Sequence, residues 1–107
     1  MDNYTLSYLP QFSEDLNQAV KYISNDLMNP IAANNLINEV ESAINERLNN
    51  SPESFEPYPS KKQRQYPYYR IYVNDYTVYY VVIHTREGAI MEVRRLLNNR
   101  QNRDNFL

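Results

Sequence analysis

Two kinds of hydrophobic periodicity follow one another at the start of the chain. Over residues 3–8 apolar side chains alternate with polar or small ones, which is the pattern of a short strand. After Pro10 apolar side chains recur every three or four residues, which predicts a helix from about residue 11 to about residue 27. The chain therefore begins as a strand followed by a helix.

A second helical pattern begins immediately after the first. Asn29 followed by Pro30 is a typical N-cap and first-turn pair, and the helical spacing then continues to about Asn49. Only two or three residues separate the two predicted helices. Because a connection that short makes helices antiparallel neighbours, we expect a helical hairpin with one apolar face.

The last third of the chain predicts a β-meander. Four of the six prolines fall in residues 49–67, which have no regular period and are typical of a surface loop. β-Branched and aromatic residues then become dense. The predicted strands are residues 68–73, 76–84 and 89–97, with turns at Asn74-Asp75 and from Thr85 to Gly88.

This order of elements predicts one α+β domain over residues 1–107. It consists of an N-terminal strand, an antiparallel two-helix hairpin and a three-stranded antiparallel meander. We expect the helices to cover one face of a four-stranded sheet.

Composition removes several classes of function. The chain has no cysteine and a single histidine, His84, so neither a metal site nor a cysteine nucleophile is expected, and no cofactor is implied. No apolar run approaches the roughly 18 residues of a membrane span, and the N-terminus lacks a secretory signal. We expect a soluble cytoplasmic protein with no membrane partner.

Charge is distributed unevenly along the chain. Up to Ser51 there are seven acidic residues and two basic ones, whereas the remainder has nine basic residues and six acidic ones. The C-terminal half is therefore the half that could meet a polyanion, although such a balance is also common on an ordinary solvated surface.

Tyrosine is concentrated in the predicted sheet, where seven of the eleven tyrosines lie between Tyr66 and Tyr80. Both alternating sets of residues 76–84 are apolar, which predicts a central strand covered on both faces. In the preceding strand Tyr69, Ile71 and Val73 share one face, and the opposite face carries the remaining aromatic and basic side chains. These are Tyr68, Arg70 and Tyr72.

Helices can cover only one face of this sheet, so we expect about half of the tyrosines to line an open aromatic and basic surface. Such a surface suits stacking on unpaired bases with contacts to phosphates. It equally suits a protein interface, in which tyrosine and arginine are enriched. A third possibility is that the tyrosines pack against the C-terminal tail of the chain itself.

Several segments taken together resemble one family. They are the Asn29-Pro30 helix start with Ala32-Ala33, the paired strands YRIYV and YTVYYVV, and the ending RRLLNNRQNRDNFL. In this order they are similar to the RelE/ParE superfamily, the toxins of bacterial type II toxin-antitoxin systems. The resemblance spans Tyr4 to Leu107, and its most telling part is Arg95 followed by a turn and Arg100.

The resemblance implies one of two activities. RelE-like members cleave mRNA at the ribosome without a metal, and ParE-like members inhibit DNA gyrase. Both are neutralised by a cognate antitoxin, so a toxin–antitoxin hetero-oligomer is expected. A third possibility, of another class, is a binding domain that keeps this fold and has lost toxicity.

Catalytic residues carry over from the cleaving members only in part. Arg70 and Arg100 match basic positions, and the resemblance implies that they would stabilise charge on the phosphate. Thr77 stands where cleaving members have an arginine, and Phe106 lies near a tyrosine position but cannot transfer a proton. Cleavage also needs a proton acceptor and a donor. The remaining candidates, Glu92, His84 and Tyr72, match no family position.

These departures, with a helical hairpin that resembles the longer one of ParE-like members, favour gyrase inhibition over mRNA cleavage. Arg70 and Arg100 are then the catalytic candidates only if the protein is a nuclease. The residues that we expect to contact the target or the antitoxin are Tyr68, Tyr72, Arg95, Arg103 and Phe106.

Overall fold

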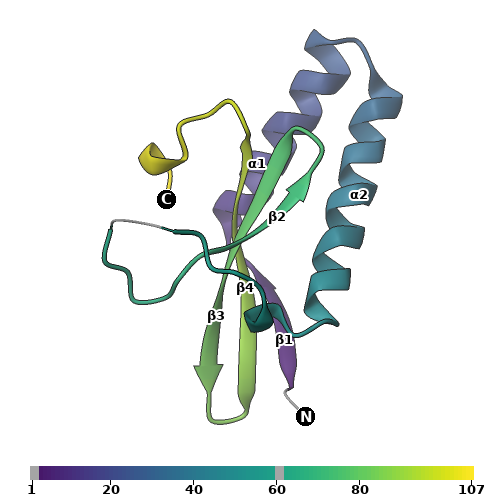
Figure 1. Ribbon diagram of the computed structural model, residues 1–107. Helices are drawn as coiled ribbons and strands as arrows, with labels where there is room; N and C mark the ends of the chain where they lie inside the picture. The colour runs from purple at the N-terminus through teal and green to yellow at the C-terminus, as the bar shows by residue number, and fades with distance from the viewer. Residues whose placement is uncertain (1–2, 60–61) are drawn as a thin grey trace.

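A computed structural model describes residues 3–59 and 62–107 of the chain (Figure 1). Its strands are β1 (Tyr4–Tyr8), β2 (Tyr69–Val73), β3 (Tyr76–Thr85) and β4 (Gly88–Asn98), and its α-helices are α1 (Pro10–Lys21) and α2 (Pro30–Leu48). Short helical turns occupy Tyr22–Asp26, Pro52–Ser54 and Arg103–Asn105.

The four strands form one mixed sheet in the order β1-β4-β3-β2. β2, β3 and β4 are the predicted antiparallel meander, and β1 joins the edge of β4 in parallel. The predicted α+β class and the two-helix, four-strand layout are confirmed. The central position of β3 is confirmed as well, since six consecutive residues from Thr77 to Val82 are buried.

The main departure from the predicted elements lies at the end of the first helix. α1 ends at Lys21, and the chain continues as a wider π-helical turn in which the Leu27 N–H donates to the Tyr22 carbonyl at 3.1 Å. Hydrophobic spacing predicts how far the helical segment runs but does not distinguish the wider turn. Met28 then takes a left-handed φ of 51° before α2 begins.

The N-terminus of α2 forms as the sequence predicts. The Asn29 side-chain oxygen accepts a hydrogen bond from the Ala32 N–H at 3.1 Å, and Pro30 occupies the first turn. The cap satisfies one of the backbone donors that a helix start leaves without an intrahelical partner. No helix in the described parts of the chain is long and apolar enough to cross a membrane.

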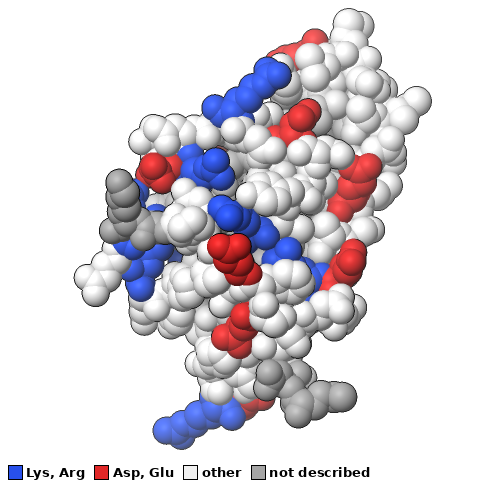
Figure 2. All heavy atoms as spheres, viewed as in Figure 1, with Lys and Arg blue, Asp and Glu red and all other residues white. Residues whose placement is uncertain are grey.

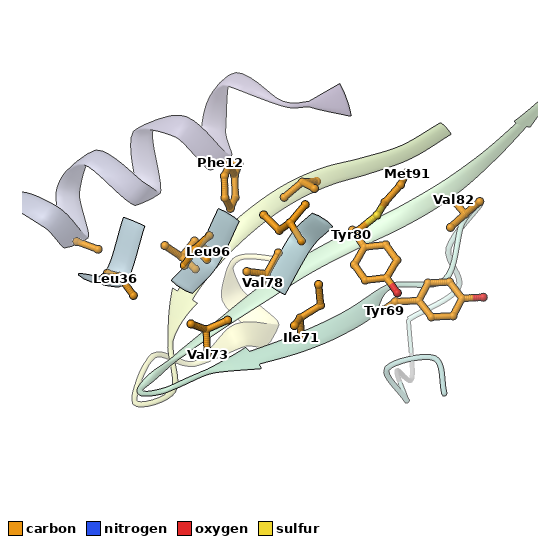
Figure 3. Packing of buried hydrophobic residues seen from close by; sticks show 14 of the residues in the cluster. Phe12, Leu36, Tyr69, Ile71, Val73, Val78, Tyr80, Val82, Met91 and Leu96 are labelled. Atoms are coloured by element: carbon orange, nitrogen blue, oxygen red, sulfur yellow. The ribbon is translucent and has the colours of Figure 1, made fainter. Parts of the chain in front are cut away.

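The larger hydrophobic core lies between the helices and one face of the sheet (Figure 3). Tyr69, Ile71 and Val73 of β2 all point into it, as their alternation predicts. Tyr69 and Tyr80 stack with ring centroids 5.3 Å apart, and Figure 3 shows the two rings side by side. On this face the tyrosines are core residues.

A polar network ties α2 and the loop that follows it to the buried end of the Tyr80 side chain. Arg47 Nη1 donates to the Tyr80 hydroxyl at 2.8 Å and to the Arg70 carbonyl at 3.2 Å. The Tyr80 hydroxyl in turn donates to the Pro52 carbonyl at 2.8 Å. Tyr80 is fully buried, so its hydroxyl cannot bond to water, and these two protein partners satisfy it instead.

Tyr80→Phe should lower the free energy of unfolding by about 1 to 3 kcal/mol, because the change leaves the Pro52 carbonyl without its donor and the Arg47 guanidinium without one acceptor. Urea unfolding of the wild type and the variant measures this loss. Tyr69→Phe is the matched control, because the hydroxyl of Tyr69 has no hydrogen-bond partner in the described chain. Equal losses in both variants would contradict the role assigned to the network.

Candidate functional site: an aromatic and basic sheet face

The sheet face opposite the helices carries a second, smaller hydrophobic cluster. Tyr68, Tyr79, Val81 and Leu97 form its buried part. The loop before β2 and the C-terminal segment pack over it through Tyr58 and Leu107, and Figure 1 shows both segments on the side of the strands away from α2. The Tyr58 N–H donates to the Tyr68 carbonyl at 2.6 Å, which fixes the loop to the sheet.

The expectation of an open surface is therefore wrong for part of this face. Tyr68 is only 8% exposed and Tyr79 only 2%, because the chain's own loop and tail cover them. Tyr72 is 62% exposed, as expected. Most of the seven clustered tyrosines are core residues, divided between the two faces of the sheet, and the contact role predicted for Tyr68 would require movement of the covering segments.

Arginines surround the rings of this face. The guanidinium carbon of Arg70 lies 5.4 Å from the Tyr58 ring centroid and 5.7 Å from that of Tyr72. Arg103 lies 5.8 Å from the same Tyr58 ring. Similar contacts place Arg64 4.9 Å and Arg94 5.9 Å from Tyr68, and Arg95 5.3 Å from Phe106. Such distances are those of cation–π contacts.

We call this set of side chains the aromatic-basic face. It comprises the rings Tyr58, Tyr68, Tyr72, Tyr79 and Phe106 and the cations Arg64, Arg70, Arg94, Arg95 and Arg103. Figure 2 shows basic side chains over the middle and left of the view with acidic ones between them, and further acidic side chains along the side occupied by α2.

A β-bulge in β4 places two consecutive arginines in this region. Tyr79 pairs with Arg95 and Tyr80 pairs with Val93, so Arg94 is the extra residue. Arg94 Nε bonds Glu92 at 2.8 Å, and Arg95 turns toward α1. The predicted contact residue Arg95 is thus engaged inside the fold.

The partner of Arg95 is Asp15, which sequence reasoning missed. Its carboxylate accepts from Arg95 Nε at 2.8 Å and from Nη2 at 2.9 Å, and also from the Leu96 backbone N–H at 3.0 Å. β1 pairs with β4 only as far as Val93. Beyond that residue Asp15, in place of a neighbouring strand, supplies the acceptor for the Leu96 N–H of β4. The hydrogen bond with Asp15 raises the pKa of Arg95, which keeps the guanidinium charged. A signal was present, because Asp15 lies three residues after Phe12 and four before Ala19 on the buried side of the helix.

Arg70 and Arg103 differ from Arg94 and Arg95, which are paired with Glu92 and Asp15. Within the described residues, neither Arg70 nor Arg103 has a carboxylate partner at ion-pair distance, although Asp104 accepts from the Tyr58 hydroxyl beside them at 3.3 Å. A hydrogen bond with Tyr79 raises the pKa of Arg103, so it stays charged. These two cations are free to pair with a carboxylate or phosphate of another molecule.

The C-terminal segment is held to the face by a few polar contacts. Arg95 Nη1 donates to the Phe106 carbonyl at 3.2 Å, and Lys62 Nζ donates to the Asp104 carbonyl at 2.7 Å. Phe106 remains 41% exposed beside Arg95. The Phe106 side chain of the tail is thus part of the accessible surface of the aromatic-basic face.

Arg100 lies apart from Arg70. It follows β4 and lines a hollow of about 940 Å³ on the helix side of the sheet, together with Tyr22 and Tyr76, whereas Arg70 stacks on rings of the opposite face. The two predicted catalytic arginines are therefore not brought together.

Of the proton-transfer candidates, Tyr72 is exposed beside Arg70, whose guanidinium carbon lies 5.7 Å from its ring centroid, whereas Glu92 is paired with Arg94 at 2.8 Å. Thr77 is buried and its hydroxyl donates to Asn99 Oδ1 at 2.6 Å. His84 bonds Glu53 at 2.7 Å, five residues further along β3 than the Tyr79 position that faces Arg70, or roughly 17 Å away. Burial raises the pKa of Tyr58, which makes its phenol a weaker acid and keeps it protonated at neutral pH. Within residues 3–59 and 62–107 no group of three or more metal-ligating side chains converges.

In this site a helical hairpin backs one face of a small sheet, and the other face of the sheet presents arginines and aromatic rings. The model of the ParE toxin of the type II toxin-antitoxin system, parDE, matches residues 6–103. The chain belongs to this family of toxins, and the family implies a cognate antitoxin as a partner. A search of curated proteins found no match.

Proposed function

We propose that this toxin arrests growth by binding DNA gyrase, and that it does so through the aromatic-basic face without catalysing a reaction. The observation that carries the proposal is a pair of arginines, Arg70 and Arg103, that have no carboxylate partner among the described residues; both lie over the Tyr58 ring, and Arg70 also lies beside the exposed ring of Tyr72. Arginine and tyrosine are the residue types that most often dominate the energy of a protein interface. The match to the model of the ParE toxin supports gyrase as the target.

Cleavage of mRNA, the alternative activity in this superfamily, finds less support. It needs fixed positive charge, a proton acceptor and a proton donor around one phosphate. In this chain Arg70 and Arg100 lie on different sides of the sheet, and His84 is paired with Glu53 at its far end. Phe106 has no proton to transfer.

The purified toxin should block supercoiling of relaxed plasmid by gyrase in a dose-dependent manner, because the proposal makes gyrase its direct target. In parallel, the same preparation should leave mRNA intact in a ribosome-containing translation mixture. Gel electrophoresis of the plasmid and primer extension on the mRNA measure the two activities. Normal supercoiling in a molar excess of toxin, together with codon-associated cuts in the mRNA, would show that the target is the ribosome and not gyrase. Inactivity in both assays would favour a domain that has lost toxicity.

A further inference from the structure

The hollow beside Arg100 takes no part in the proposed function. It lies where the turn after β4 and the turn between β2 and β3 approach the helical hairpin (Figure 1). Its volume is about 940 Å³, and a second hollow of about 400 Å³ adjoins it, because four residues line both. They are Tyr22, Tyr76, Asn98 and Arg100. The larger volume is within the range of pockets that hold a small organic ligand.

Polar side chains of this hollow are left without partners inside the protein. Within the described residues, the Arg100 guanidinium and the Asp75 carboxylate are in no ion pair, and neither they nor the Asn35 amide has a side-chain hydrogen bond. Glu39, by contrast, accepts a hydrogen bond from the Asn74 side chain. Unengaged polar groups that converge on one hollow are what a ligand site provides.

The backbone that carries Asp75 and Arg100 is fixed before any ligand arrives. The Asn99 N–H donates to the Asp75 carbonyl at 2.8 Å, which ties the turn after β4 to the turn between β2 and β3. The Arg100 N–H donates to Asn98 Oδ1 at 2.9 Å, and the buried Thr77 hydroxyl holds the Asn99 side chain at 2.6 Å. A site built on such a support loses less entropy when a ligand binds.

Three backbone irregularities surround the same hollow. The π-helical turn begins at Tyr22, whose side chain is 50% exposed on the wall. Asn74, another wall residue, has a left-handed φ of 54°. Met28, with a φ of 51°, lies between Leu27 and Asn29, which both line the hollow. π-Turns and left-handed residues other than glycine are found more often at functional sites than elsewhere.

We infer that this hollow is a binding site for a guanine nucleotide with one phosphate. The base stacks on the rings of Tyr22 and Tyr76, since any base offers a flat face to an aromatic side chain. The Asp75 carboxylate accepts from the ring N–H and the amino group of guanine, and the Arg100 guanidinium pairs with the phosphate.

The charges of the wall select the number of phosphates and the base. Arg100 is the one cation among the described residues that line either hollow, whereas Glu39 and Asp75 are both acidic, so a second phosphate would meet repulsion. Guanine places a ring N–H beside its amino group, and one carboxylate can accept from both. Adenine has the amino group without that ring N–H, so the same carboxylate accepts from it only once.

An NMR titration of the isotope-labelled full chain with GMP tests the inference. Chemical-shift changes should centre on residues of the hollow, among them Tyr22, Asn35, Asp75, Tyr76 and Arg100. GMP should bind at least about tenfold more tightly than guanosine, which lacks the phosphate, and than AMP, which lacks the second donor, because a hydrogen bond to a charged group contributes about 1.5 to 3 kcal/mol.

Two matched pairs of variants assign the two polar contacts. Arg100→Ala should bind GMP at least about tenfold more weakly and guanosine as wild type does, whereas Arg86→Ala, in the exposed turn between β3 and β4, should change neither. Asp75→Asn should abolish the preference for GMP over AMP. Asp26→Asn, which removes a charge outside the residues lining the hollow, should keep it.

Four results would each overturn the inference. They are no shifts at millimolar GMP, shifts centred on Arg70 and Arg103 of the aromatic-basic face, equal binding of GMP and AMP by the wild type, and an equal loss of GMP and guanosine in Arg100→Ala. If Arg100→Ala does not fold, the comparison of GMP with guanosine on the wild type decides. Because the titration contains no gyrase, its failure is distinguishable from failure of the proposed function.

Discussion

Asp15→Ala will lower the free energy of unfolding by about 3 kcal/mol, the largest stability effect that we expect from one polar side chain in this protein. The change leaves Arg95 without its carboxylate and the Leu96 N–H without its acceptor, both in a region closed by α1. Removing one partner of a mostly buried ion pair costs more than the pair contributes, because the remaining charge stays poorly solvated. Urea denaturation measures the effect.

Asp15→Asn separates the two roles of that carboxylate. Asparagine keeps an oxygen that can accept from the Leu96 N–H but has no charge for Arg95. The free energy of unfolding of Asp15→Asn should therefore lie between that of wild type and that of Asp15→Ala. Asp26→Asn, at an exposed position in the same helical segment, serves as the control and should be within about 0.5 kcal/mol of wild type. If the Asp15 variants lose no more unfolding free energy than Asp26→Asn, the ion pair between Asp15 and Arg95 does not stabilise the fold.

Replacing both Arg70 and Arg103 with alanine should weaken gyrase inhibition by at least a hundredfold. Each is an arginine beside an aromatic ring with no carboxylate of its own, and truncation of such an anchor typically costs about 2 kcal/mol or more, roughly thirtyfold in affinity. The toxin concentration that halves supercoiling measures the loss. The fold should survive, because neither guanidinium has an ion-pair partner in the described chain.

Arg86→Ala is the matched control for the double variant. Arg86 is exposed in the turn between β3 and β4 and belongs to none of the cation–π contacts of the described face. The Arg86→Ala toxin should inhibit gyrase as strongly as the wild type does. If the double variant inhibits gyrase as well as Arg86→Ala does, another surface of the toxin meets the target.

The sequence predicts the architecture well because each element carries its own local signal. Alternation marks β1, Asn29 and Pro30 mark the start of α2, and Asn74-Asp75 mark the tight turn between β2 and β3. The two apolar sets of residues 76–84 correctly place β3 in the centre of the sheet. These features depend on neighbours within a few residues, which periodicity can detect.

The candidate site was harder to predict, because it depends on segments far apart in the chain. Nothing in the proline-rich loop indicates that Tyr58 packs on Tyr79, with ring centroids 5.9 Å apart, or that this loop covers Tyr68. Strand alternation assigns Tyr68 to the correct face but cannot say what covers that face. The pairing of Asp15 with Arg95 likewise joins residues eighty positions apart.

The two arginines expected to act on one phosphate show the same limit. Arg70 and Arg100 were carried over separately, each from a matching position in a family pattern. Their relation in space depends on how the chain turns after β4, and that turn takes Arg100 toward the hollow beside Tyr22 and Tyr76. A pattern of residues can therefore suggest both members of a site without establishing that they meet.

The central claim, that this toxin stops growth through gyrase, is tested most directly by inducing the chain alone in a bacterium. Incorporation of labelled thymidine and labelled amino acids is followed in one culture during the first minutes. DNA synthesis that falls while translation continues is the expected result. An immediate fall in amino-acid incorporation, ahead of any change in DNA synthesis, would contradict the claim and point to the ribosome.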